Sequence, residues 1–168
     1  MLKPQLWTRR RFAAVGAAAV VWPALARGAK DDAALGISRT AEAIHQVVSF
    51  KAAPARVYQA LVDETQFSKL TGPPAQIGRE PGGAFALFGG QIVGRHLELA
   101  PGERVVQAWR SEGWPPHVYS IVRFELGAQG SGTRLVFDHT GFPVGQAEHL
   151  AAGWKEHYWD ALAKLPPG

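Results

Sequence analysis

The chain has 168 residues, no cysteine, and 18 Lys and Arg against 14 Asp and Glu, a formal net charge of +4. The lack of cysteine excludes disulfides, thiol catalysis and thiolate zinc sites. Four of the basic residues lie in the first 26 positions, and the remainder balances at 14 basic and 14 acidic residues. No basic surface of the kind that binds nucleic acid is therefore expected.

The first 26 residues have the three regions of a twin-arginine export signal. Thr8–Phe12 fits the pattern Ser/Thr-Arg-Arg-x-Phe, an apolar Ala-rich run follows from Ala13 to Leu25, and Ala24–Ala26 offers a small-x-small cleavage site. The run is shorter than the ~20 apolar residues needed to cross a bilayer, so no permanent membrane anchor is expected. The pattern predicts cleavage after Ala26 and a periplasmic protein. A basic amphipathic anchor and a misassigned start are the alternatives.

Residues 27–43 are small and polar, which predicts a linker before a single domain at residues 44–166. Alternation from Ile44 to Phe50 predicts a strand. Pro54 suits the first turn of a helix, because its missing N–H needs no partner there, and this helix is expected to end near Val62. A second short helix is expected from Glu64 to Leu70, before Thr71-Gly72-Pro73-Pro74.

The following segments alternate in the manner of strands and are separated by turn residues. The five expected strands are Ala84–Phe88, Gln91–Leu99, Arg104–Arg110, His117–Leu126 and Thr133–His139. Their alternation is typical of an antiparallel sheet with one covered face. A long helix from Gln146 to Leu165 has apolar residues at helical spacing and must bury them on that sheet.

These elements predict an α+β fold: a curved six-stranded antiparallel sheet, two short helices after the first strand, and a long C-terminal helix over the sheet. This order resembles the helix-grip fold of the START-like or SRPBCC superfamily. The residues resemble the branch named for the activator of the heat-shock-protein-90 ATPase. The similar stretches are Ala53–Leu61, Gly82–Phe85, Gly94 with Leu97–Leu99 and Pro101, Val105–Arg110, Gly132–Leu135, Gly141–Pro143 and Gly153-Trp154. The resemblance implies a cavity between sheet and helix that holds a hydrophobic or aromatic small molecule.

Alternation places a mainly aromatic set of side chains on the covered face, with a few polar groups among them. The expected cavity-lining and ligand-binding residues are Phe85, Leu97, Trp109, Ser120, Val122, Phe124, Phe137, His139, Leu150, Trp154 and Tyr158. Apolar walls with few polar groups are typical of small-molecule sites, although a solid core has the same composition. Gly153 lies inside the expected helix and predicts close packing of helix on sheet, since a helical glycine costs about 1 kcal/mol relative to alanine.

No catalytic residue, metal ligand or cofactor is assigned. The six histidines, His45, His96, His117, His139, His149 and His157, form no metal-binding motif, and no nucleophile elbow or phosphate-binding loop is present. An acid–base pair of His139 and Tyr158 across the cavity is the enzymatic alternative. The loop around Trp114, followed by two prolines, predicts either a lid at the cavity mouth or a hydrophobic plug.

Three functions remain open at this point. The first is a periplasmic module that binds or carries a small hydrophobic molecule. The second is an acid–base enzyme acting on a polyketide-like or aromatic substrate in the same cavity. The third is an interaction module for a protein of the cell envelope. An open, mostly apolar cavity favours the first, a buried, ionisable His139 without a hydrogen-bond partner favours the second, and a collapsed cavity with a large exposed apolar patch favours the third.

Overall fold

The computed structural model describes residues 42–167. The predicted export signal, its cleavage site and the linker up to residue 41 lie outside these residues. The first strand, β1 (Glu42–Phe50), begins two residues inside the segment expected to be linker. In the described range, no helix combines the length and the apolar character that a membrane crossing requires.

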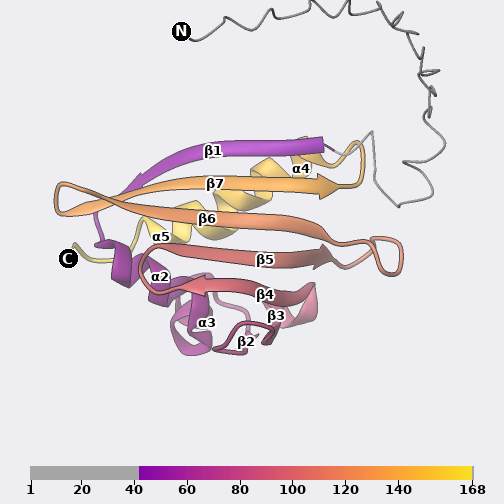
Figure 1. Cartoon of the computed structure of the whole chain (residues 1–168), viewed down its shortest axis with the longest axis horizontal. Helices are drawn as coiled ribbons and strands as arrows, with labels where there is room; N and C mark the ends of the chain where they lie inside the picture. Colours follow the sequence, from indigo (N-terminus) through magenta and orange to yellow (C-terminus); the bar gives the residue numbers. More distant parts are fainter. Residues whose placement is uncertain (1–41, 168) are drawn as a thin grey trace, which may run out of the picture. The chain divides into compact units, whose positions relative to one another are not determined.

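The sheet is antiparallel throughout and has seven strands, in the order β1-β7-β6-β5-β4-β3-β2 (Figure 1). The other strands are β2 (Gln76–Ile77), β3 (Ala84–Leu87), β4 (Ile92–Ala100), β5 (Arg104–Ser111), β6 (Ser120–Gln129) and β7 (Gly132–Phe142). The expectation of six strands was wrong because β2, which pairs with β3, is only two residues long and carries no alternation. β6 begins at Ser120 rather than His117, whose φ of 65° is incompatible with a strand.

A bulge in β4 corrects the expected orientation of Leu97. His96 pairs with Gln107 and Glu98 pairs with Val106, so Leu97 is an extra residue without a partner on β5. A bulge shifts the phase of inward and outward side chains by one residue. His96 is therefore fully buried, and Leu97 is 51% exposed on the opposite face.

The two expected helices follow β1. α2 (Pro54–Val62) has its proline in the first turn and contacts β6 and β7. α3 (Glu64–Thr71) begins at Asp63, whose side chain accepts a hydrogen bond of 3.0 Å from the Gln66 backbone N–H. This is the usual N-cap interaction, and it satisfies a donor that the helix itself leaves free.

The expected long C-terminal helix is confirmed, but it is not a regular α-helix. α4 (Ala147–Gly153) runs into η2 (Trp154–Trp159), a segment of π-helix, and then into α5 (Asp160–Leu162). Figure 1 shows this helix crossing behind the sheet. Trp154, Tyr158 and Trp159 of the π segment are all buried.

Aromatic rings fill the space between the middle of the sheet and this helix. Trp154 lies 4.5 Å from Phe137, and Phe137 lies 5.3 Å from Phe124, measured between ring centroids. Trp159 packs against the same Phe137 at 5.0 Å. The covered face of β6 and β7 is therefore solid core.

Candidate functional site

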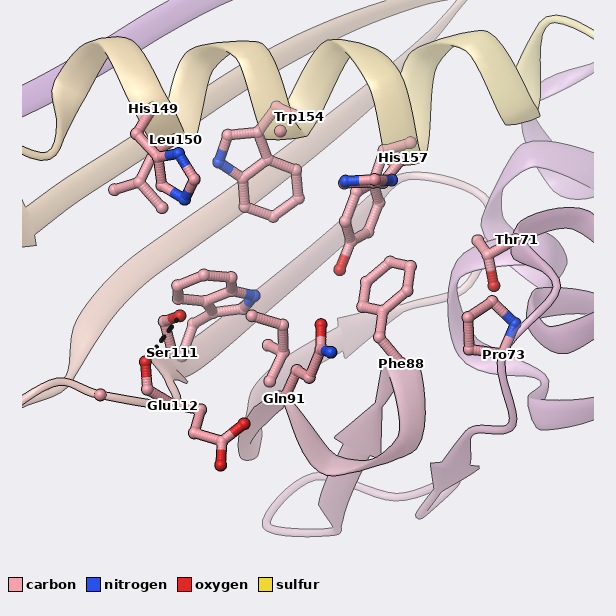
Figure 2. A pocket seen from close by; sticks show the side chains of 15 residues that line it. Thr71, Pro73, Phe88, Gln91, Ser111, Glu112, His149, Leu150, Trp154 and His157 are labelled. Carbon is pink, nitrogen blue, oxygen red and sulfur yellow. Dashed lines mark hydrogen bonds between the residues drawn. The ribbon is translucent and has the colours of Figure 1, made fainter.

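A pocket of about 690 Å³ lies along one side of the C-terminal helix, next to this aromatic core. Six of its lining residues come from the helix: His149, Leu150, Gly153, Trp154, His157 and Tyr158. The sheet contributes Ile92, Trp109 and Ser111. The end of α3 contributes Thr71, a 3₁₀ turn contributes Phe88, and the loops contribute Pro73, Gln91, Glu112 and Gly113. Figure 2 shows His149, Leu150, Trp154 and His157 projecting from the helix toward Phe88, Gln91 and Glu112 on the other side.

Only some of the expected lining residues reach this pocket. Trp109, Leu150, Trp154 and Tyr158 line it. The others that are buried, Phe85, Ser120, Val122, Phe124, Phe137 and His139, lie in the core away from it, and Leu97 lies on the outer face of the sheet. The cavity is displaced toward the ends of β4 and β5 because the rings of Trp154 and Trp159 occupy the centre of the covered face.

Gly153 contributes open space rather than close packing. Its φ of −61° and ψ of −41° are ordinary α-helical values, so its backbone does not require glycine. A Cβ atom built on Gly153 would meet no atom within 4 Å. The expectation that this glycine allows the helix to approach the sheet is therefore wrong. Its effect is to leave part of the helical pocket wall without a side chain.

Two polar atoms at the inner end of the pocket have no hydrogen-bond partner among the described residues. They are the indole N–H of Trp109 and the hydroxyl of Tyr158, whose side chains are 3% and 6% exposed. Burial raises the pKa of Tyr158, and the nearby Trp109 N–H offsets only part of that rise. The Trp109 N–H and the Tyr158 hydroxyl do not form a hydrogen bond with each other. Each group therefore still has a hydrogen that it could donate.

His139 has hydrogen-bond partners on both ring nitrogens. The indole N–H of Trp154 donates to Nδ1 at 3.0 Å, and Nε2 lies 2.7 Å from the Ser120 hydroxyl oxygen. Ser120 donates its own hydrogen to the backbone oxygen of Trp109 at 3.0 Å, so Nε2 is the protonated nitrogen and Ser120 accepts from it. Burial lowers the pKa of His139 to about 3. The ring is thus neutral and fixed in one tautomer, and it lies behind the lining residues Trp109 and Trp154 rather than in the pocket wall.

The loop around Trp114 forms a plug, one of the two alternatives left open by the sequence. Trp114 is buried, and its ring meets that of Trp109 edge to face at 5.4 Å. Its backbone oxygen accepts a hydrogen bond of 2.7 Å from the Arg110 guanidinium. Trp114 therefore supports the inner wall of the pocket from behind and does not line it.

Phe88 is a lining residue that the sequence analysis did not identify. It was expected to end the strand Ala84–Phe88 but lies in η1 (Phe88–Gly90), the 3₁₀ turn that joins β3 to β4, and has a φ of 52°. A positive φ is unusual for an aromatic residue and often marks a functional position. The ring packs against Phe67 at 5.4 Å and Tyr158 at 5.6 Å. In the sequence, only its position directly before Gly89-Gly90 could have indicated that Phe88 lines the pocket.

The sequence matches one protein family over most of the described domain. Residues 51–166 match the family described as Activator of Hsp90 ATPase homolog 1-like protein. The chain is 26% identical over 132 residues to "Activator of 90 kDa heat shock protein ATPase homolog 2" of Mus musculus, which covers 79% of this chain and 40% of that protein. It is 31% identical over 114 residues to "Activator of 90 kDa heat shock protein ATPase homolog" of Dictyostelium discoideum, which covers 67% of this chain and 30% of that protein. The chain thus spans less than half the length of these relatives.

Solved structures share the fold. PFC0360w, an HSP90 activator from Plasmodium falciparum, superposes with a TM-score of 0.67 at 24% identity, covering 70% of this chain and 91% of that chain. CalU16 from Micromonospora echinospora superposes with a TM-score of 0.63 at 25% identity, covering 73% of this chain and 74% of that chain. At 24% identity, the likeness to PFC0360w shows the fold alone.

Proposed function

Because the chain belongs to the family of activator of Hsp90 ATPase homolog 1-like proteins, whose fold is compatible with a ligand-binding domain, we propose that it binds a small, mainly apolar molecule in the pocket beside Gly153. The observation that carries this proposal is the pocket itself. Its volume of about 690 Å³ lies in the range of small-molecule sites, and its walls are aromatic and aliphatic side chains with a few polar groups.

The helical wall supports the same proposal. A glycine inside a helix costs about 1 kcal/mol relative to alanine, and the backbone angles of Gly153 suit either residue. No neighbouring atom excludes a methyl group at this position. The presence of a glycine that makes the helix less stable is explained if a ligand occupies the open space beside it. The π segment that begins at Trp154 fits as well, since such segments often occur at functional sites.

The acid–base alternative has less support. It requires a histidine able to exchange protons with a substrate, whereas both nitrogens of His139 are already hydrogen-bonded and the ring lies outside the pocket lining. The protein-interaction alternative requires a collapsed cavity, and the cavity is open. The names of the curated relatives point to an activator of a chaperone ATPase. That activity stays a separate proposal for a chain that covers 30–40% of their length.

Native mass spectrometry tests the binding proposal. We expect protein isolated without denaturant to carry a reproducible extra mass that organic solvent releases. Gly153→Leu is expected to abolish this mass, because the new side chain extends into the space beside the helix. Ala152→Leu is the matched control, since it adds the same side chain at an exposed position one residue away and is expected to retain the ligand. A wild-type protein that carries no extra mass and also binds none of a panel of lipids and aromatic compounds would contradict the proposal.

We further propose that the protein acts in the periplasm after cleavage behind Ala26. Support comes from the order of twin arginines, apolar run and small-residue site in the sequence. Replacing Arg9 and Arg10 together with lysine keeps the charge but removes the twin-arginine pattern. This variant is expected to accumulate uncleaved in the cytoplasmic fraction, whereas Arg11→Lys is expected to be exported. Cell fractionation followed by intact-mass measurement shows where each variant accumulates and whether it is cleaved. Equal export of both variants would refute this localisation.

A further inference from the structure

The inner end of the pocket holds two hydrogen-bond donors that the protein itself does not use. The Trp109 indole nitrogen can only donate, and the Tyr158 hydroxyl lacks any acceptor. Most buried polar groups in native proteins have a partner, so an unmatched pair in one place requires an explanation. Both residues line the pocket, which makes a bound molecule the natural partner.

The surroundings of these donors exclude a partner from the neighbouring core. Trp109 packs edge to face against Trp114 at 5.4 Å and His139 at 5.0 Å. Tyr158 packs against Phe67 at 5.6 Å and Trp154 at 4.3 Å. Of these neighbours, only His139 carries a ring acceptor, and its Nδ1 already accepts from Trp154. None of these ring neighbours offers a free acceptor, and a ligand in the pocket can supply one.

The charge of the lining indicates which kind of acceptor fits. Among the described residues that line the pocket, none is Lys or Arg, the acidic one is Glu112, and His149 and His157 are the other ionisable groups besides Tyr158. A carboxylate or phosphate would have to be buried without a fixed positive charge, which is costly. An uncharged carbonyl oxygen has two lone pairs and can accept from both donors without this cost.

We propose that the pocket selects an uncharged carbonyl compound with an apolar body, whose oxygen accepts hydrogen bonds from the Trp109 indole N–H and the Tyr158 hydroxyl. The apolar body lies toward Phe88 and the open helical wall at Gly153. This inference rests on the proposed ligand-binding function and adds the chemical class of the ligand. Both donor atoms lie beneath the pocket surface, and the carbonyl oxygen accepts from them there.

Three probes of nearly equal size separate the effects of the apolar body, the carbonyl group and a negative charge on affinity. They are 2-acetylnaphthalene, which carries the carbonyl, 2-ethylnaphthalene, which lacks it, and 2-naphthoate, which adds a negative charge. Each hydrogen bond is expected to be worth about fivefold in affinity, so the ketone is expected to bind about 20-fold more tightly than the hydrocarbon. The naphthoate is expected to bind more weakly than the ketone. Isothermal titration with the full-length protein in the syringe accommodates the low solubility of the hydrocarbon.

Tyr158→Phe provides the direct test. The preference for ketone over hydrocarbon is expected to fall to about fivefold, while the affinity for the hydrocarbon stays the same. The melting temperature is expected to stay unchanged or to rise, because the removed hydroxyl has no partner in the protein. Tyr119→Phe is the matched control, since Tyr119 is 50% exposed and absent from this pocket's lining. This variant is expected to retain the 20-fold preference.

The outcomes distinguish this inference from the function on which it rests. Equal affinities of the wild-type protein for the ketone and the hydrocarbon would overturn the carbonyl proposal and leave the binding function intact. A ketone preference that survives Tyr158→Phe at full size would also overturn it. If none of the three probes binds and no native ligand is found by mass spectrometry, both proposals fail together.

Discussion

Replacing Trp154 with alanine is expected to lower the free energy of unfolding by about 3–5 kcal/mol, the range for removal of a large buried aromatic side chain. Trp154 is 2% exposed and lies at the junction of core and pocket. Its ring contacts Phe137 on β7 and Tyr158 on the same helix, and its indole N–H supplies the hydrogen bond to His139 Nδ1. The substitution thus leaves a cavity and an unpaired buried acceptor together.

Urea unfolding at pH 7 measures this effect, and a second variant separates its two components. Trp154→Phe keeps most of the ring but removes the N–H, so it is expected to cost about 1–3 kcal/mol, the penalty for leaving His139 Nδ1 unsatisfied. Tyr119→Ala removes an aromatic ring from the exposed face of the sheet and is expected to cost much less. A Trp154→Ala protein as stable as wild type would show that this residue does not hold the helix on the sheet.

Lowering the pH from 6.5 to 5 is expected to destabilise the folded protein by at least about 1.6 kcal/mol, because the slope reaches its full value only well below pH 6.5. Burial holds the pKa of His139 at about 3 in the folded state, against an ordinary value of 6.5. Between these values the unfolded chain binds a proton at this residue and the native chain does not, so stability falls as the pH falls, by about 1.4 kcal/mol per pH unit. Burial also lowers the pKa of His96, which adds to the slope in the same direction.

The control for this pH dependence is a residue at position 139 that cannot titrate. His139→Gln can still offer a donor and an acceptor, and it is expected to be less stable at pH 7 but to show a shallower fall between pH 6.5 and 5. His149→Gln, at the exposed helix surface by the pocket, is expected to keep the full slope. Unfolding curves at several pH values provide the measurement. A slope that is unchanged in His139→Gln would show that this histidine titrates normally in the folded state.

The sequence predicted the architecture because the signals for it are local and repeated. The alternation of β6 and β7 placed Val122, Phe124, Phe137 and His139 on the covered face, and all four are buried there. The proline at the start of α2 and the apolar repeat of the C-terminal helix fixed those elements in the same way. Each of these inferences depends on residues that are neighbours in the chain or one turn apart.

The candidate site was predicted less well, because it depends on departures from regular structure. Leu97 was assigned to the cavity by counting in steps of two from Leu99, and the bulge at that residue reverses the phase. Phe88 was missed because it belongs to the 3₁₀ turn between β3 and β4 and not to the expected strand Ala84–Phe88. The π segment at Trp154–Trp159, which carries three buried aromatic residues, has no periodic signature of its own.

The sequence by itself thus determined the order of the elements, the covered face of the sheet and the helix that covers it, since hydrophobic periodicity follows directly from strand and helix geometry. Only the tertiary structure decided where the packed core ends and the pocket begins. That boundary depends on whether the rings of Trp154 and Trp159 fill the space above Phe137, and on the bare wall at Gly153. Packing is a property of residues distant in the chain, so the same aromatic sequence is compatible with a solid core or a cavity until the helix is placed on the sheet.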